Sequence, residues 1–321
     1  MITAKDADFH TPANADFRWC ETRPFMFNVP EANISGTCYT VTRPVLGVCM
    51  SDVTIFDRIS QVWEHQLYVD NQQHLPCPKS LLDYTLPNGL SVRAIKPTEH
   101  YAIRYEGIDD TLLDFEFEAI MAPYDMNDPD TNPLARARHD SGWNDAFGGH
   151  YEQAGRVRGT ASIRGREYRL DTVEVIDRSW GPRAERDNGA AVWLHANFGE
   201  GLVMHALFSF DPAHAREFGA LITGFVLEDG KVYGAVSIAG RGERAGLLPM
   251  GTELLITDVR GKSFLLTGSA VNSGPWAPYP SLVYATSMMR WNCDGRVGHG
   301  IHQNVVSRAY MTRHREKMQA G

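Results

Sequence analysis

The chain has 321 residues, of which 43% are hydrophobic and 22% are charged, and its formal net charge is −8. These values are typical of a folded globular protein, and the length favours two domains. The negative charge and the lack of a basic stripe argue against nucleic acid or an anionic membrane surface as a partner. No apolar run approaches the roughly 20 residues of a membrane-spanning helix, so we expect no integral membrane segment.

The N-terminal segment, MITAKDADFHTPANADF, is polar and acidic and lacks the apolar centre of a signal peptide. The cysteines are odd in number, and none forms a CxxC pair; they are Cys20, Cys38, Cys49, Cys77 and Cys293. We therefore expect no disulfide framework and no structural zinc site, and we predict a cytoplasmic location.

Turn dipeptides separate alternating runs along most of the chain, at residues 88–89, 229–230, 260–261 and 294–295. Such two-residue turns join antiparallel strands because Asn, Asp and Gly tolerate positive φ. Many short antiparallel strands at hairpin spacing favour barrels or sandwiches, and a barrel of about eight strands can hold one small ligand. The sequence therefore predicts an all-β protein, with residues 308–320 as a candidate tail helix.

One segment, residues 122–149, is rich in Pro, Asp, Asn and Gly and lacks strand alternation. This composition is typical of a linker or a long loop. We therefore predict an N-terminal β domain over residues 1–122, a linker over 123–148, and a C-terminal β-barrel domain with the main site over 149–321.

Common nucleotide, hydrolase and metal motifs are absent from the sequence. There is no GxGxxG after a strand, no GxxxxGK[ST] loop, no GxSxG elbow and no HExxH helix. The two histidines of HGIH, residues 299–302, lie three positions apart in a β region and so face opposite sides. We therefore expect no cofactor and no metal, and any activity must come from residues scattered over strands.

The stretch GGHYEQAG begins the second half with a histidine and a carboxylate in alternation. On an extended strand His150 and Glu152 share one face, and Tyr151 lies on the other. A histidine beside a carboxylate can position and tune a proton donor. The alternative is a solvated strand edge after a glycine loop.

The stretch VIDRSWGPR, residues 175–183, places an aspartate where an apolar strand ends. By alternation Asp177 shares a face with the preceding valines, and Trp180 lies on the opposite face. Burial on an apolar face raises the pKa of a carboxylate, which can then act as a general acid near neutral pH. Alternatively, Asp177 caps the following Gly-Pro turn or pairs with Arg178 or Arg183.

The stretch AVWLHANFGEGLVMHALF predicts a hairpin that turns at residues 199–201. Its register places His195 opposite His205 and on one face with Trp193. The two histidines form either an acid–base unit or separate hydrogen-bonded groups inside a barrel. Aromatic residues are abundant here and could line an apolar pocket or pack in an ordinary β core; they are Trp143, Tyr151, Trp180, Trp193, Trp276, Tyr279, Tyr284 and Trp291.

Residues 148–183, GGHYEQAGRVRGTASIRGREYRLDTVEVIDRSWGPR, resemble the central signature of the carotenoid 1,2-hydratase and AttH-like family. In that family a glycine-containing hairpin precedes an Asp-x-x-Trp-Gly element, which Asp177 and Trp180 match here. WCETRPFMFNVPEANISGTCYTVTRP and LLDFEFEAIMAP resemble the partner domain, so the likeness covers most of the chain. The uncharacterised cytoplasmic branch of this family often has an arginine after Gly-Pro, as Arg183 is here, and the chain resembles that branch more than the hydratases.

This resemblance implies two antiparallel lipocalin-like (calycin-type) barrels packed together. It also implies apolar ligands such as polyenes, terpenoids, steroid-like molecules or polyketides, since relatives include hydratases and enzymes that promote cyclisation. Many relatives carry a glutamate in their last strand where this chain has Gln303, which argues against an acid at that position.

The leading hypothesis is a cofactor-independent lyase or isomerase: a hydratase, dehydratase, double-bond isomerase or cyclase that uses acid–base chemistry on an apolar small molecule. We expect Asp177 to donate or relay the proton, with Glu152, His150 and His195 as further catalytic candidates. The substrate-binding candidates are Tyr151, Trp180, Arg183, Trp193, His205 and Tyr284. The alternatives are a non-catalytic carrier of a hydrophobic molecule and an interaction protein with filled barrels; the surface also permits a homodimer.

Overall fold

The computed structural model describes residues 1–136, 147–183, 190–211 and 217–316. Within these ranges the chain is almost entirely antiparallel β, with four short 3-10 turns and one short helix, α1 (Arg308–Arg313). The all-β prediction is confirmed, and the tail helix begins at the expected residue. Trp143 and residues 137–146 of the expected linker lie outside the described ranges.

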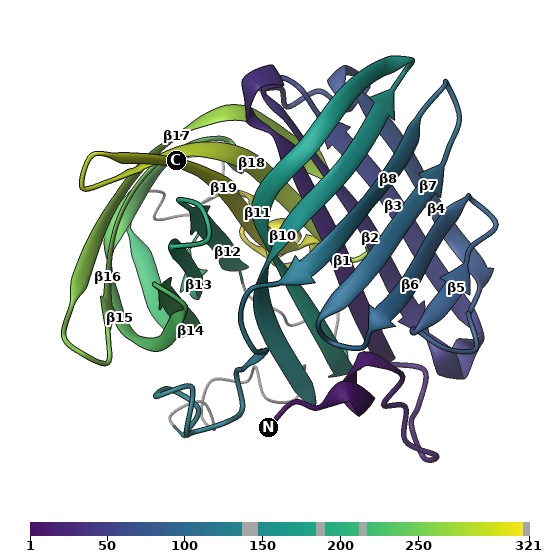
Figure 1. Cartoon of the computed structure of the whole chain (residues 1–321), viewed down its shortest axis with the longest axis horizontal. Coiled ribbons are helices and arrows are strands. Elements are labelled where there is room, and N and C mark those ends of the chain that lie inside the picture. Colours follow the sequence, from purple (N-terminus) through teal and green to yellow (C-terminus); the bar gives the residue numbers. More distant parts are fainter. Residues whose placement is uncertain (137–146, 184–189, 212–216, 317–321) are drawn as a thin grey trace.

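The first unit is an eleven-stranded curled sheet with the order β4-β3-β2-β1-β11-β10-β8-β7-β6-β5, and β9 pairs with β10 (Figure 1). Its strands are β1 (Trp19–Val29), β2 (Ile34–Arg43), β3 (Val48–Phe56), β4 (Tyr68–Pro76), β5 (Asp83–Thr85), β6 (Leu90–Lys96), β7 (His100–Glu106), β8 (Leu112–Ala119), β9 (Tyr124–Asp125), β10 (Gly149–Ile163) and β11 (Arg166–Pro182).

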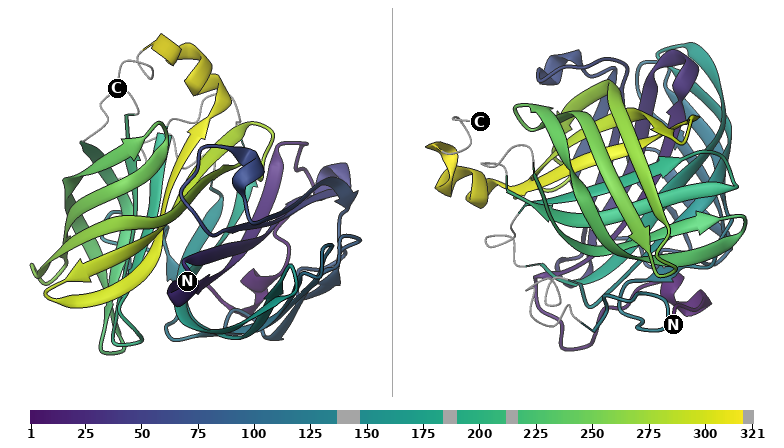
Figure 2. Two further views of the ribbon diagram at one scale, coloured as in Figure 1. Left: turned by 90° about the horizontal axis from the view of Figure 1, so that it is seen from above. Right: turned by 90° about the vertical axis from the view of Figure 1, so that its left-hand side faces the viewer.

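The second unit is a closed barrel in which consecutive strands pair from β12 to β19, as the two further views show (Figure 2). Its strands are β12 (Ala190–Asn197), β13 (Leu202–Phe210), β14 (Phe218–Glu228), β15 (Lys231–Ala245), β16 (Leu248–Asp258), β17 (Ser263–Trp276), β18 (Leu282–Cys293) and β19 (Arg296–Ser307). A closed barrel packed against a curled half-barrel is consistent with two lipocalin-like barrels.

The long hairpin of β10 and β11 belongs to the first unit, although the sequence assigned residues from 149 onward to the second. β11 pairs with β1 in the register Trp19↔Pro182 to Thr22↔Ser179, and β10 pairs with β8. Residues of the hairpin such as Ile176 join the apolar core of the first sheet. Alternation along the chain identifies these strands, but the choice of partner is made by residues far away in sequence.

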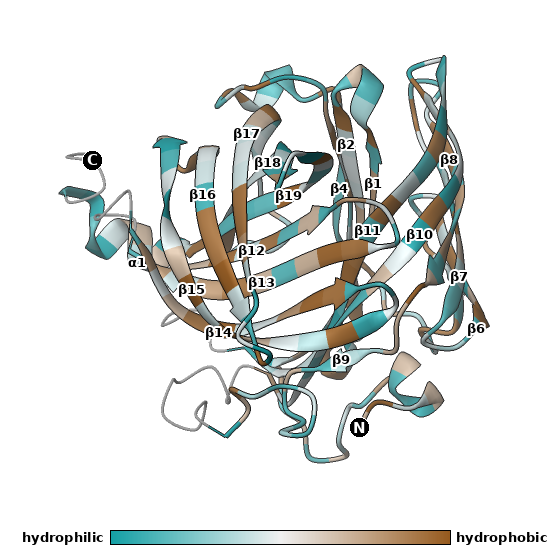
Figure 3. Ribbon diagram, turned by 60° about the vertical axis from the view of Figure 1, so that its left-hand side comes forward, coloured by the Kyte–Doolittle hydropathy of each residue, from teal (hydrophilic) through white to brown (hydrophobic). Residues whose placement is uncertain are grey.

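Two of the four predicted tight turns have both residues at positive φ, while at residues 88–89 and 260–261 only the glycine does. Asp229 and Gly230 both have positive φ, at 49° and 77°, and Asp294 and Gly295 repeat this pattern at 50° and 79°. Two consecutive residues in the left-handed region form the turn that matches the twist of a hairpin. Along β16, which lies between these turns, buried and exposed side chains alternate from Thr252 to Ile256, and Figure 3 shows the hydropathy of the barrel strands.

The sheet and the barrel share an apolar interface. Val175 on β11 and Met26 on β1 pack in one cluster with Trp193 and Leu207 of the barrel. The site described below lies at this interface. Among the described residues, no helix has the length and the apolar character that crossing a membrane requires.

Candidate active site

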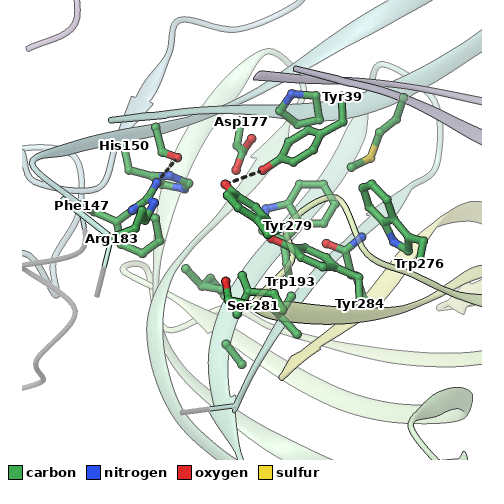
Figure 4. A pocket seen from close by; sticks show the side chains of 18 residues that line it. Tyr39, Phe147, His150, Asp177, Arg183, Trp193, Trp276, Tyr279, Ser281 and Tyr284 are labelled. Carbon is green, nitrogen blue, oxygen red and sulfur yellow. Dashed lines mark hydrogen bonds between the residues drawn. The ribbon is translucent and has the colours of Figure 1, made fainter. Parts of the chain in front are cut away.

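A cavity of about 120 Å³ lies between the curled sheet and the barrel. Its volume is several times the roughly 10–15 Å³ that one buried water requires. The walls come from both units and from segments far apart in sequence (Figure 4). The lining residues on which the argument rests are Tyr39, His150, Asp177, Arg183, Trp193 and Tyr284.

Strand pairing brings three ionisable side chains to one face of the sheet. In the β10–β11 hairpin Glu152 lies directly opposite Asp177, and His150 lies opposite Ser179. Donor atoms of His150, Glu152 and Asp177, which we call the cavity cluster, all lie within 4.8 Å of one another. The two carboxyls are thus held side by side, where both cannot easily carry a charge.

A break in the sheet ladder lies beside this cluster. The β1–β11 register ends at Thr22↔Ser179. Pro24 follows on β1 and has no N–H with which to continue the ladder. Pro24 and Asp177 both line the cavity, so the cavity lies where the two strands stop pairing.

Glu152 is fully buried at the back of the cavity. Its Oε1 accepts a hydrogen bond from Trp193 Nε1 at 3.0 Å and lies 2.7 Å from His150 Nε2. His205 Nε2 lies 3.5 Å from the same oxygen. Burial raises the pKa of Glu152 well above its usual range, and burial also lowers the pKa of His205 well below its usual range. Burial thus favours the neutral form of both side chains.

Asp177 is the carboxyl that faces the cavity. Its Oδ1 is buried and has no hydrogen-bond partner among the described residues. Burial raises the pKa of Asp177 to about 7; His150 opposes this rise and Glu152 adds to it. A buried carboxyl with an unpartnered oxygen and a pKa near neutrality can give or take a proton under physiological conditions.

Tyrosine hydroxyls from both units also line the cavity, since Tyr39 lies on β2 of the same sheet as Asp177 and Tyr279 and Tyr284 come from the barrel unit. Tyr39 and Tyr279 approach each other with their hydroxyl oxygens 3.3 Å apart, and the ring of Tyr284 stacks on that of Tyr279 (Figure 4). Burial raises the pKa of each of these three tyrosines well above its usual range. The hydroxyls therefore stay protonated and can donate hydrogen bonds to a substrate oxygen.

Arg183 lies at the edge of the cavity beside Phe147. Its guanidinium carbon lies 4.3 Å from the centre of the Phe147 ring, and its Nη2 donates to Ser179 Oγ at 2.7 Å. Arg183 is one of the groups that oppose the rise in the Asp177 pKa. This side chain thus supplies positive charge near the reacting carboxyl.

The structure brings most of the predicted residues together but not all of them. Asp177, His150, Arg183, Trp193 and Tyr284 line the cavity. Glu152 and His205 lie behind it, as described above.

Tyr151 and Trp180 lie on the other face of the sheet. Trp180 stacks on His10 with ring centroids 3.7 Å apart, and the pKa of Tyr151 is affected by Tyr101 and Arg23 inside the half-barrel. Alternation explains this placement, since both residues are one or three positions from a cavity-facing neighbour. Neither is among the residues that line the cavity.

The predicted hairpin register is confirmed, because His195 lies opposite His205. However, His195 contributes to a different polar group, in which its Nε2 lies 3.9 Å from Glu174 Oε2. Tyr39 was missed altogether. It comes from β2, whose residues give no local sign of facing a site on the barrel.

The cavity cluster is also a set of donors that could hold a metal ion. The sequence predicted no metal site, because no spacing of His, Cys and Asp matches a closed zinc site. Asp177 joins them only through the pairing of β10 with β11. One imidazole and two carboxylates would suit several divalent ions.

Comparison with protein families gives one match. Residues 3–305 match the model of a domain of unknown function, DUF7064. The chain belongs to this family. Comparison with curated proteins gives no match.

Solved structures of similar fold cover nearly the whole chain. A protein described as an AttH of Nitrosomonas europaea matches with a TM-score of 0.58 and 13% identity, over 91% of this chain and 92% of that chain. Kievitone hydratase of Nectria haematococca matches with a TM-score of 0.54 and 10% identity, over 91% and 89%. CghA matches with a TM-score of 0.55 and 12% identity, over 90% and 88%.

At these identities the likeness is one of fold. The AttH-like resemblance predicted from sequence is confirmed at that level, and its placement near one branch stays a prediction.

Proposed function

We propose that this DUF7064 protein is a cofactor-independent lyase or isomerase that acts by acid–base chemistry on an apolar small molecule. The substrate class is terpenoid-, steroid- or polyketide-like, and the reaction adds or removes water, shifts a double bond or promotes cyclisation. The observation that carries the proposal is Asp177, a carboxyl with an unpartnered oxygen and a pKa of about 7 that lines an aromatic cavity. Neighbours of the same fold include a hydratase by name.

In the proposed hydration, the Asp177 carboxyl gives its proton to one carbon of a C=C bond. A water molecule then bonds to the other carbon and returns a proton to the Asp177 carboxylate, so that the net change is the addition of water. In the isomerisation, the second proton comes from a substrate carbon instead. Aromatic faces of Trp193, Tyr284 and Trp276 stabilise the positive charge that develops between the two steps.

Glu152 and His150 support this cycle from behind Asp177. Glu152 helps to raise the pKa of Asp177, which favours the protonated form of Asp177, and His150 can accept or return a proton through its contact with the Glu152 oxygen. The hydroxyls of Tyr39 and Tyr279 would bind an oxygen of the substrate. We propose substrate contacts for Arg183, Trp193 and Tyr284, and a supporting role for His205.

A turnover screen against terpenoid, steroid and aromatic alcohol libraries tests the proposal, with mass spectrometry as the readout for gain or loss of water. For a substrate found in this way, we expect kcat/KM to fall as pH rises through about 7, because the protonated form of Asp177 is the acid. Saturable binding with no turnover of any bound compound would support the alternative, a carrier of a hydrophobic molecule.

A further inference from the structure

A second polar group lies on the same interface, away from the cavity. Asn28, Thr172, Glu174, His195 and Asn197, which we call the groove cluster, each have a buried side-chain atom with no hydrogen-bond partner among the described residues. Buried polar atoms are normally paired, so such a concentration calls for a ligand or ordered water. Four of the five, all except His195, line a surface groove of about 470 Å³. This volume is within the range of about 300–1,000 Å³ that ligand pockets have.

Hydrogen bonds fix the orientation of His195. Asn197 Nδ2 donates to Val173 O and lies 3.0 Å from His195 Nδ1. An amide nitrogen only donates, so Nδ1 must be the acceptor. Burial lowers the pKa of His195 to about 3, so the ring is neutral and its one proton is on Nε2. Glu174 Oε2 lies 3.9 Å from this nitrogen, which is too far for a hydrogen bond.

Glu174 presents a second donor to the same gap. Its Oε1 accepts from Asn28 Nδ2 at 2.8 Å. Burial raises the pKa of Glu174 to about 8, so the carboxyl is mostly protonated at neutral pH, with the proton on the unpartnered Oε2. Two donors without a partner therefore lie 3.9 Å apart, while the unpartnered amide oxygens of Asn28 and Asn197 are acceptors. A hydroxyl group, which both accepts and donates, satisfies this arrangement.

The rim of the groove disfavours anions. Arg156 is paired there with two carboxylates, Asp171 at 2.8 Å and Glu200 at 2.7 Å. Arg158 and Arg169 also lie within 4 Å of Asp171, so each of these arginines already has a carboxylate partner. The half-buried ring of Phe198 also lines the groove and offers an apolar surface. Mixed donors and acceptors, an aromatic face and a rim whose arginines are paired with carboxylates suit a neutral sugar or polyol.

We propose that this groove is a binding site for a neutral polyhydroxylated ligand such as a sugar, with its hydroxyls bound by Glu174 and by the amide oxygens of Asn28 and Asn197. The proposal does not rest on the chemistry of the cavity cluster. His195 Nδ1 is occupied by Asn197, so the imidazole is not free to pass a proton on toward His205 and Glu152. The two clusters are therefore separate sites.

The test is a titration of the full chain with glucose, xylose, sorbitol and, as a charged counterpart, gluconate, followed by ligand-observed NMR. Thr172 lies beside the Glu174 carboxyl but makes no hydrogen bond of ordinary geometry. Thr172→Val keeps the shape of the side chain and removes the hydroxyl. We expect saturable binding of at least one neutral compound, weakened by roughly three- to tenfold in Thr172→Val, as for one lost hydrogen bond.

Thr223→Val is the matched control. Thr223 also has a buried, unpartnered hydroxyl, but it is not among the residues that line the groove, so its loss should leave binding unchanged. Asp177→Asn should also bind the sugar normally, which separates this proposal from the proposed function. Three results would overturn it: no saturable binding of any neutral compound, which would mean that the groove holds only water; equal binding by Thr172→Val and the wild type; or tighter binding of gluconate.

Discussion

The cavity cluster and the groove cluster use the same kinds of side chain at one interface, yet their surroundings give them different properties. Both pair a carboxyl on β11, the half-buried Asp177 or the buried Glu174, with a nearby histidine. Asp177 faces a cavity walled by aromatic rings and lies beside a second carboxyl. Glu174 faces a groove with a charged rim, and its histidine is fixed by Asn197. A carboxyl and a histidine in contact therefore do not define a function until the atoms around them are known.

The largest difference between the two clusters should appear in turnover. Asp177→Asn keeps the size of the side chain and removes the acid, and we expect the rate to fall by ~10²–10⁴-fold, the usual contribution of a general acid or base. Ligand binding should change little, because the shape of the cavity is preserved. Steady-state kinetics together with a binding titration would measure both.

Asp52→Asn is the matched control for that substitution. Asp52 is another buried carboxyl, whose pKa burial raises to about 6, but it lies on β3 and its Oδ1 accepts from Thr54 at 2.5 Å. We expect this variant to turn over substrate at the wild-type rate. Equal loss of activity in both variants would mean that stability, and not the chemistry of Asp177, limits the rate.

The pH dependence of stability distinguishes the two carboxyls. The pKa of Asp177 rises from 3.8 to about 7 on folding, and that of Glu174 from 4.5 to about 8. Each group favours the folded state at low pH, and this stabilisation is lost as pH rises through the folded pKa. The unfolding free energy of each variant relative to the wild type should therefore increase with pH. The increase should end near pH 7 for Asp177→Asn and near pH 8 for Glu174→Gln.

Each pKa unit corresponds to about 1.4 kcal/mol, so the gain amounts to a few kcal/mol for each variant. Urea unfolding of both variants and the wild type at a series of pH values would measure it. A difference in unfolding free energy that does not vary with pH would show that the carboxyl has an ordinary pKa.

A smaller effect on stability is expected from the hydrogen bond between Trp193 and Glu152 behind the cavity. Trp193→Phe removes the N–H that Glu152 accepts at 3.0 Å while keeping most of the ring. We expect a loss of about 1–3 kcal/mol in unfolding free energy, because a buried acceptor loses a partner. Trp291→Phe is a suitable comparison, since its indole N–H donates to the backbone oxygen of His195 and not to a carboxyl. We expect the loss of unfolding free energy to vary with pH in Trp193→Phe but not in Trp291→Phe.

Chelation should have the smallest effect, namely none. Acid–base chemistry at Asp177 needs no metal, so activity should survive exhaustive treatment with a chelator. Loss of activity that one divalent ion restores would instead assign the cavity cluster as a metal site, with His150, Glu152 and Asp177 as the ligands.

The all-β class, the tight turns and the His195–His205 register could be predicted because they depend on neighbours in sequence. The face on which Asp177 lies also followed from alternation. Alternation did not predict the domain to which β10 and β11 belong, because that depends on their pairing with β8 and β1. The place of Tyr39 in the cavity wall could not be predicted either. Alternation gives the face of the strand on which Tyr39 lies, but not the part of the protein that packs against that face.

The central pairing of β1 with β11 joins residues near the N-terminus to residues that end at Pro182. During synthesis, β1 to β4 must therefore wait with one long edge unpaired until more than half of the chain has left the ribosome. Contacts between such distant segments form slowly, and unpaired edges invite pairing with other chains. A shortened chain that ends near residue 149 would expose this edge permanently, so we expect it to aggregate and to require chaperones during expression.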